Sequence, residues 1–176
     1  GALYAHNVPK VIFLDFDGVM NTERYIAERR RNGFPVSDRY GYLFDPEAVE
    51  NLRRIIDATG TAVVISSSWR LEGEERMEAM WHERALPGRL IGVTGQSQYA
   101  NFAMSAGETA GATKGEEIRG WLKEHASKSY RYVIFDDEAD IRPEQRPHFI
   151  QTDPRIGITR TDAERAIQIL NGGNHD

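Results

Sequence analysis

The feature that most constrains the fold of this chain is an uninterrupted apolar run, residues 11–14, that ends at an aspartate. A run without alternating polar residues is typical of a strand that is buried on both faces of a parallel sheet. Two carboxylates, Asp15 and Asp17, follow it, and Gly18 permits a tight turn after them. Because buried carboxylates are costly without a cation or a proton, this motif predicts a site for a hard divalent cation. A solvated acidic turn is the alternative interpretation.

The rest of the chain alternates short apolar runs with amphipathic helical patterns. Further strands are predicted at 61–65, 90–93, 132–135 and 148–151. Three helix starts are predicted: Asp45 as N-cap before Pro46, a capping box of Thr113 with Glu116, and a second box of Thr161 with Glu164. Met77, Met80 and Trp81 mark a further amphipathic element. Residues 94–112, rich in small residues, are predicted to form a loop. Strands that alternate with helices predict a Rossmann-like α/β fold, a three-layer sandwich with a mainly parallel sheet.

Length and composition narrow the class of protein. A chain of 176 residues is long enough for one domain, residues 1–176, with a flap or small cap expected at 19–44. The absence of cysteine excludes disulfides, thiolate metal sites and cysteine nucleophiles. No apolar run approaches the ~20 residues of a membrane span, and residues 1–10 lack a signal-peptide pattern, so we expect a cytoplasmic protein that does not bind membranes. The formal net charge of −5 argues against a sequence-indifferent nucleic-acid coat.

Polar residues follow the predicted strands where a parallel sheet binds its ligands. Asp15, Ser66 and Asp136 each stand at the end of an apolar run, so the carboxyl edge of the sheet should gather them. Hydroxyls and backbone amides at Ser66 and Ser67 could hold phosphoryl oxygens, and Arg70 could bind a phosphate through two hydrogen bonds. A polar turn that caps a helix and an exposed surface arginine are the alternatives.

A lysine and an acidic pair complete the candidate site. Of the four lysines, Lys114 is placed at a helix N-terminus, where the helix dipole disfavours a cation unless an anion lies nearby. Asp136 and Asp137 could complete an octahedral magnesium site with Asp15. Asp137 is the first choice as direct ligand, Asp136 could bind through water, and Asp140 is a weaker candidate. A surface lysine and an ordinary acidic loop are the alternatives.

Taken together, the motifs resemble those of the haloacid dehalogenase (HAD) superfamily. The stretch 15–19, Asp-Phe-Asp-Gly-Val, is similar to the first family motif, and Ser66, with Ser67 as fallback, matches the second. Lys114 matches the third motif, and the pair at 136–137 resembles the fourth, acidic motif. The acid at position 17 resembles the pattern of the family's phosphatases. Dehalogenases lack an acid at this position, and pump ATPases have threonine.

The resemblance implies a role for each matched position. Asp15 would be the nucleophile that takes up a phosphoryl group, and Asp17 the general acid and base. Ser66 would hold phosphoryl oxygens, and Lys114 would neutralise charge between Asp15 and the phosphoryl group. Mg²⁺ is the implied cofactor, with a set of ligands made of Asp15, the backbone carbonyl of Asp17, Asp136 and Asp137.

The residues that make up the motifs also resemble those of one subfamily. Ser-Ser-Ser-Trp-Arg at 66–70, Ile-Phe-Asp-Asp at 134–137 and Gln-Thr-Asp-Pro at 151–154 resemble the HAD domain of "Swiss army knife" RNA-repair proteins, kin to the phosphatase half of polynucleotide kinase-phosphatases. The resemblance covers roughly residues 10–172. The expected function is a magnesium-dependent phosphomonoesterase with a phosphorylated substrate, either a nucleic-acid end or a nucleotide. A phosphatase of a small metabolite is the first alternative, and a non-catalytic phosphate-binding module is the second.

A cluster of arginines follows the first motif in the expected flap. A basic flap could clasp a polyanionic substrate, whereas a solvated helix face is the alternative. The arginines stand at positions 24, 29, 30, 31 and 39. The sequence indicates no protein partner.

Overall fold

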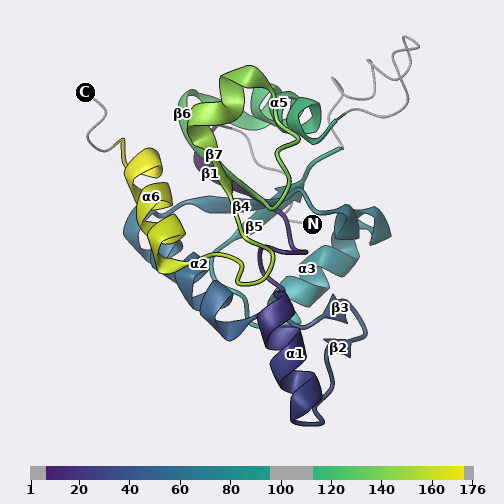
Figure 1. Ribbon diagram of the computed structural model, residues 1–176. Helices are drawn as coiled ribbons and strands as arrows, with labels where there is room; N and C mark the ends of the chain where they lie inside the picture. Colours follow the sequence, from purple (N-terminus) through teal and green to yellow (C-terminus); the bar gives the residue numbers. More distant parts are fainter. Residues whose placement is uncertain (1–6, 96–112, 173–176) are drawn as a thin grey trace.

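The computed structural model describes residues 7–95 and 113–172 (Figure 1). Most of the loop predicted at 94–112 lies outside the described residues. Within these two ranges, no helix has both the length and the apolar character needed to cross a membrane.

The core element is a five-stranded sheet in the order β5-β4-β1-β6-β7. Its strands are β1 (Val8–Leu14), β4 (Ala62–Ile65), β5 (Leu90–Val93), β6 (Ala126–Asp136) and β7 (Phe149–Gln151). Every neighbouring pair is parallel, so all carboxyl ends point to the same edge. β1 lies in the centre between β4 and β6, which confirms the predicted α/β architecture.

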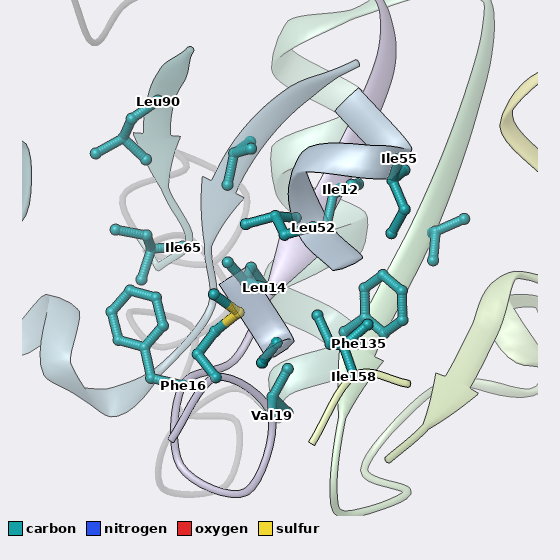
Figure 2. Packing of buried hydrophobic residues seen from close by; sticks show 14 of the residues in the cluster. Ile12, Leu14, Phe16, Val19, Leu52, Ile55, Ile65, Leu90, Phe135 and Ile158 are labelled. Atoms are coloured by element: carbon teal, nitrogen blue, oxygen red, sulfur yellow. The ribbon is translucent and has the colours of Figure 1, made fainter. Parts of the chain in front are cut away.

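Helices cover both faces of this sheet. α2 (Pro46–Thr59), α3 (Glu74–Glu83) and α6 (Arg160–Leu170) pack on one face, where Ile12 and Leu14 of β1 point (Figure 2). α5 (Lys114–His125) packs on the other face, against Val11 and Phe13. The side chains of residues 11–14 in β1 are all fully buried, which explains why this run contains no polar residue.

Residues 19–44, named the flap below, contain a helix and a small hairpin that stand off the sheet (Figure 1). Helix α1 (Glu23–Arg31) has no buried residue, and β2 (Ser37–Asp38) pairs with β3 (Gly41–Tyr42) in an antiparallel hairpin. Arg84, at the end of α3, holds this hairpin by donating hydrogen bonds to both carboxylate oxygens of Asp38, at 3.0 and 2.7 Å, and to the Gly41 carbonyl. The same guanidinium lies 4.6 Å from the centre of the Phe44 ring, so one largely buried cation connects the hairpin to the core.

Two strands begin earlier than the apolar runs predict. β6 starts at Ala126, six residues before the run at 132–135, and β1 starts at Val8. Ala126 pairs with Val8 and Arg131 with Lys10, so backbone pairing extends both strands although the added side chains of β6 are largely exposed. Hydrophobic pattern alone does not report such an extension.

The prediction of a capping box at Thr161 and Glu164 is wrong. Helix α6 begins at Arg160, and its box consists of Thr159 with Asp162, two residues earlier. The chain offers two overlapping boxes of this kind, and tertiary contacts select the first. The backbone N–H of Ile158 donates to the Val19 carbonyl at 3.1 Å, and the Ile158 carbonyl accepts from the Asn51 side chain at 2.9 Å. Thr159 is therefore the first residue that is free to begin the helix.

We predict that Gly157→Ala costs much more stability than Gly33→Ala. Both glycines have a positive φ, +67° and +72°, so each substitution carries a backbone penalty of about 1–2 kcal/mol. A Cβ at Gly157 would also collide with the Val19 carbonyl oxygen, whereas a Cβ at Gly33 meets no atom within 4 Å. The collision should add about 1–3 kcal/mol, which urea unfolding of both variants would measure. Equal midpoints for the two variants would contradict the tight packing of Gly157 on the first motif.

Candidate active site

The carboxyl ends of three neighbouring strands meet at the candidate site. The backbone N–H of Asp15 donates to the Phe135 carbonyl at 3.1 Å, and that of Ser66 donates to the Leu14 carbonyl at 2.9 Å. These hydrogen bonds continue the β1–β6 and β1–β4 ladders by one residue. They place the buried side chains of Asp15, Ser66 and Asp136 at one edge of the sheet, where the sequence predicts them.

Three carboxylates form a cluster at this edge. Oxygens of Asp15, Asp136 and Asp137 all lie within 4.8 Å of one another. Gly18 faces the cluster from the first motif: its φ is +78°, and a Cβ there would lie 2.5 Å from Asp137 Oδ2. The turn after Asp15 can approach Asp137 this closely only because residue 18 has no side chain.

The cluster carries more negative charge than its surroundings can balance. Burial, followed by the nearby charge of Asp136, raises the pKa of Asp15 to about 7, against the opposing effect of Lys114. Burial, together with a hydrogen bond and charge from Asp136, also raises the pKa of Asp137. Three carboxylates with a single ammonium group suit a hard cation that takes oxygen ligands, so Asp15, Asp136 and Asp137 could hold a divalent metal ion.

Lys114 is the cation that reaches the cluster. Its Nζ lies 2.8 Å from Asp136 Oδ2 and 3.5 Å from Asp15 Oδ1. Burial alone would lower the pKa of Lys114, but the hydrogen bond to Asp136 and the charges of both aspartates raise it. Lys114 is the first residue of α5, after a capping box formed by Thr113 and Glu116 as predicted. The helix start thus positions the ammonium group between two strand ends.

Asp17 lies apart from the three clustered carboxylates and is exposed. Its Oδ1 accepts a hydrogen bond from Asn21 Nδ2 at 2.8 Å, and the indole N–H of Trp69 donates to Oδ1 and Oδ2 at 3.2 and 3.3 Å. These donors fix the orientation of the carboxylate. Sequence reasoning did not identify either donor, although Asn21 stands four residues after Asp17 and Trp69 belongs to the second motif.

The hydroxyl groups of the second motif differ in their surroundings. Ser67 Oγ accepts from the Trp69 backbone N–H at 3.2 Å and caps a short 3-10 helix, η1 (Ser68–Glu72). Ser66 Oγ is fully buried and has no hydrogen-bond partner among the described residues. Thr94, directly after β5, also has a buried hydroxyl without a described partner. Ser66 therefore offers a free donor beside the carboxylate cluster, and no sequence signal had marked Thr94.

Arg70 is engaged within the protein. Its Nε donates to the Thr94 carbonyl at 3.0 Å, and its Nη1 donates to the Ser67 carbonyl at 3.0 Å. Its Nη2 lies 2.9 Å from both carboxylate oxygens of Glu117 on α5. The guanidinium thereby ties the second motif to β5 and α5, and phosphate binding by Arg70 stays a prediction.

Two open clefts adjoin the site at Asp17. One has a volume of about 440 Å³ and is lined by residues that include Gly18, Asn21, Asp137 and Pro154. The other, of about 550 Å³, extends along Tyr40, Trp69 and Met77. Both reach from the exposed carboxylate of Asp17 toward the flap, so a substrate group larger than a phosphate has room beside the cluster.

Comparison with known proteins places the chain in a family. A family model for the HAD domain in Swiss Army Knife RNA repair proteins matches residues 11–163, which include all four motif positions. Among solved structures, a protein described as a HAD superfamily (subfamily III A) hydrolase from Legionella pneumophila matches at 14% identity with a TM-score of 0.39, over 93% of this chain and 84% of that chain. No curated protein matches. The chain belongs to the HAD superfamily, in the family of HAD domains found in Swiss Army Knife RNA repair proteins.

Proposed function

We propose that this chain is a magnesium-dependent phosphomonoesterase that works through an aspartyl phosphate on Asp15. The observation that carries the proposal is the buried carboxylate cluster with Lys114, together with the buried Ser66 hydroxyl, which has no hydrogen-bond partner in the described part of the chain. A buried hydroxyl without a partner is rare, and it suits a ligand oxygen that the free protein lacks. Membership of a HAD hydrolase family supports the same chemistry.

In the proposed reaction, a carboxylate oxygen of Asp15 attacks phosphorus in line with the leaving oxygen. The bond from Asp15 to phosphorus forms as the bond to the leaving group breaks, and Asp17 donates a proton to the leaving oxygen. Asp17, then ionised, takes a proton from the water that attacks the aspartyl phosphate, which releases inorganic phosphate and restores Asp15. Lys114 Nζ and the Ser66 hydroxyl donate hydrogen bonds to the phosphoryl oxygens.

The residues around Asp15 suit Mg²⁺ as the cofactor. Asp15, Asp136 and Asp137 would hold the ion, with the backbone carbonyl of Asp17 as a further ligand by family resemblance. When bound, Mg²⁺ supplies positive charge that offsets the phosphoryl oxygens and the carboxylates. Hydrogen bonds to Asn21 and Trp69 keep the Asp17 carboxylate turned toward the open clefts, where a leaving group would lie.

We propose a nucleic-acid end or a nucleotide as the substrate. The matching family is named for RNA repair proteins, and the two clefts beside Asp17 offer space for a bulky leaving group. A small metabolite would undergo the same chemistry but would leave most of these clefts empty.

We predict that Asp15→Asn lowers kcat on p-nitrophenyl phosphate by on the order of 10³-fold or more, because an amide cannot act as the nucleophile. Asp57→Asn is the matched control, since Asp57 is exposed near the end of α2 and takes no part in the site. Circular dichroism should show both variants folded. Turnover by Asp15→Asn near that of the control would refute the assignment of Asp15.

Removal of the metal should abolish turnover, and added Mg²⁺ should restore it, with Mn²⁺ as a substitute. Mg²⁺ should also raise the Tm of the wild-type protein, because it relieves repulsion within the carboxylate cluster and binds only the folded chain. Asp137→Asn should lower the Mg²⁺ affinity, read from the rise of Tm with metal concentration, by at least about 10-fold. Scanning fluorimetry with a metal titration measures both effects, and full activity in excess chelator would contradict the proposal.

A further inference from the structure

Two residues of the flap line both clefts together with Asp17. Arg30, in the last turn of α1, and Tyr42, in β3, are common to the cleft of about 440 Å³ and the cleft of about 550 Å³. Asp17 is the proposed proton donor to the leaving group. Arg30 and Tyr42 therefore stand where the part of the leaving group beyond the scissile oxygen would lie.

Three of the five clustered arginines have intramolecular partners. Arg24 pairs with Asp45 at 3.0 Å and with Glu47 at 2.6 Å. Arg39 pairs with Glu83 at 2.9 Å. Arg29 donates through Nε to the Pro35 carbonyl and through Nη1 to the Tyr25 hydroxyl at 3.1 Å. Arg24 and Arg39 thus connect the flap to α2 and α3, and Arg29 has its partners within the flap, so the cluster is not a uniform basic surface.

Arg30 and Arg31 differ in their position relative to the clefts. Both are exposed, and no ion pair or side-chain hydrogen bond of the described residues involves either guanidinium group. Both stand in the last turn of α1, where the helix dipole stabilises either positive charge. Of the two, only Arg30 lines the clefts, so only Arg30 is placed to contact a ligand there.

The charges around Arg30 favour one additional phosphate rather than a long polyanion. The smaller cleft also contains Glu23 and Asp137, and the larger contains Glu72, so among residues 7–95 and 113–172 Arg30 is the one cation that lines either of them. A guanidinium can bind one phosphate through two parallel hydrogen bonds. A nucleic-acid strand bound through several phosphates would instead be repelled by these carboxylates.

Tyr42 offers an aromatic ring in the same two clefts as Arg30. Its exposed fraction is 42%, which is high for a large aromatic side chain. Tyr42 pairs with Ser37 in the hairpin, and Arg84 holds the hairpin to the core through Asp38 and Gly41. A ring that is exposed but anchored in this way can stack on a nucleobase at little cost in conformational entropy.

We infer that Arg30 binds a second phosphate of the substrate, one that is not hydrolysed, and that Tyr42 stacks on the adjoining nucleobase. The inference rests on the proposed function and names its substrate class. The preferred substrate is a nucleotide or nucleic-acid end in which the terminal phosphomonoester is accompanied by a second phosphate on the same nucleoside.

The test compares four phosphate monoesters with the full chain and Mg²⁺: adenosine 3′,5′-bisphosphate, the adenosine 3′- and 5′-monophosphates, and p-nitrophenyl phosphate. Wild-type kcat/KM should be highest for the bisphosphate. Arg30→Ala should raise KM for the bisphosphate by about 10-fold to 100-fold, the range of a lost charge-assisted hydrogen-bonded pair, and leave kcat unchanged. Arg30→Ala should leave both constants for p-nitrophenyl phosphate unchanged.

Two control variants separate the specific effect from general ones. Arg31→Ala removes the same charge from the same helix turn and should change no KM by more than about 2-fold. Tyr42→Ala should raise KM for all three nucleotides but not for p-nitrophenyl phosphate, and Tyr42→Phe should restore it because the ring is kept. Equal effects of Arg30→Ala and Arg31→Ala, or no effect of Arg30→Ala, would overturn the inference.

A binding measurement keeps this result independent of turnover. Calorimetry with adenosine 3′,5′-bisphosphate and the Asp15→Asn chain, with and without Arg30→Ala, should show the same 10-fold to 100-fold loss of affinity. A wild-type chain that binds the bisphosphate through Arg30 but hydrolyses no monoester would refute the proposed function alone. A chain that hydrolyses p-nitrophenyl phosphate and binds the bisphosphate equally well without Arg30 would refute this inference alone.

Discussion

The ion pair of Lys114 with Asp136 and Asp15 is the interaction on which the rest of the site depends. The parallel register that pairs Leu14 with Phe135 brings the next residue of each strand, Asp15 and Asp136, to adjacent strand ends. Two carboxylates this deeply buried would repel each other strongly without a cation. The ammonium group at the start of α5 lies within 3.5 Å of both, so the β1–β6 pairing and the docking of α5 are coupled to the charge balance of the site.

The flap is positioned by the same aromatic cluster that orients Asp17. The Phe16 ring lies 4.9 Å from that of Phe44 and 5.1 Å from that of Trp69, centre to centre. Trp69 donates from this cluster to Asp17, and Arg84 lies over the Phe44 ring while it holds the hairpin. The candidate proton donor and the walls of the clefts are therefore built on one packed unit. A shift of the hairpin should move the donors of Asp17 as well.

Most of the sheet and the placement of the motif residues could be predicted, because each strand that contributes to the site is a buried run that ends in a polar residue. Asp15, Ser66 and Asp136 carry that signal locally, and Lys114 follows a capping box. The start of β6, the box at Thr159 and the donors to Asp17 could not be predicted, since each depends on contacts between residues distant in the sequence. The flap arginines look alike in sequence, and only their partners in the fold separate Arg30 from Arg24, Arg29 and Arg39.

In the proposed reaction Asp15 carries the phosphoryl group, and chemical trapping tests this role most directly. The Asp17→Asn chain, which lacks the base that activates water, is mixed with p-nitrophenyl phosphate and Mg²⁺ and then quenched in denaturant. Borohydride reduces an aspartyl phosphate, but not a free carboxylate, to homoserine, so peptide mass spectrometry identifies the phosphorylated residue. Homoserine should appear at position 15, and only when substrate was present. Release of p-nitrophenol by this chain with aspartate intact at position 15, or with homoserine at another aspartate, would contradict it.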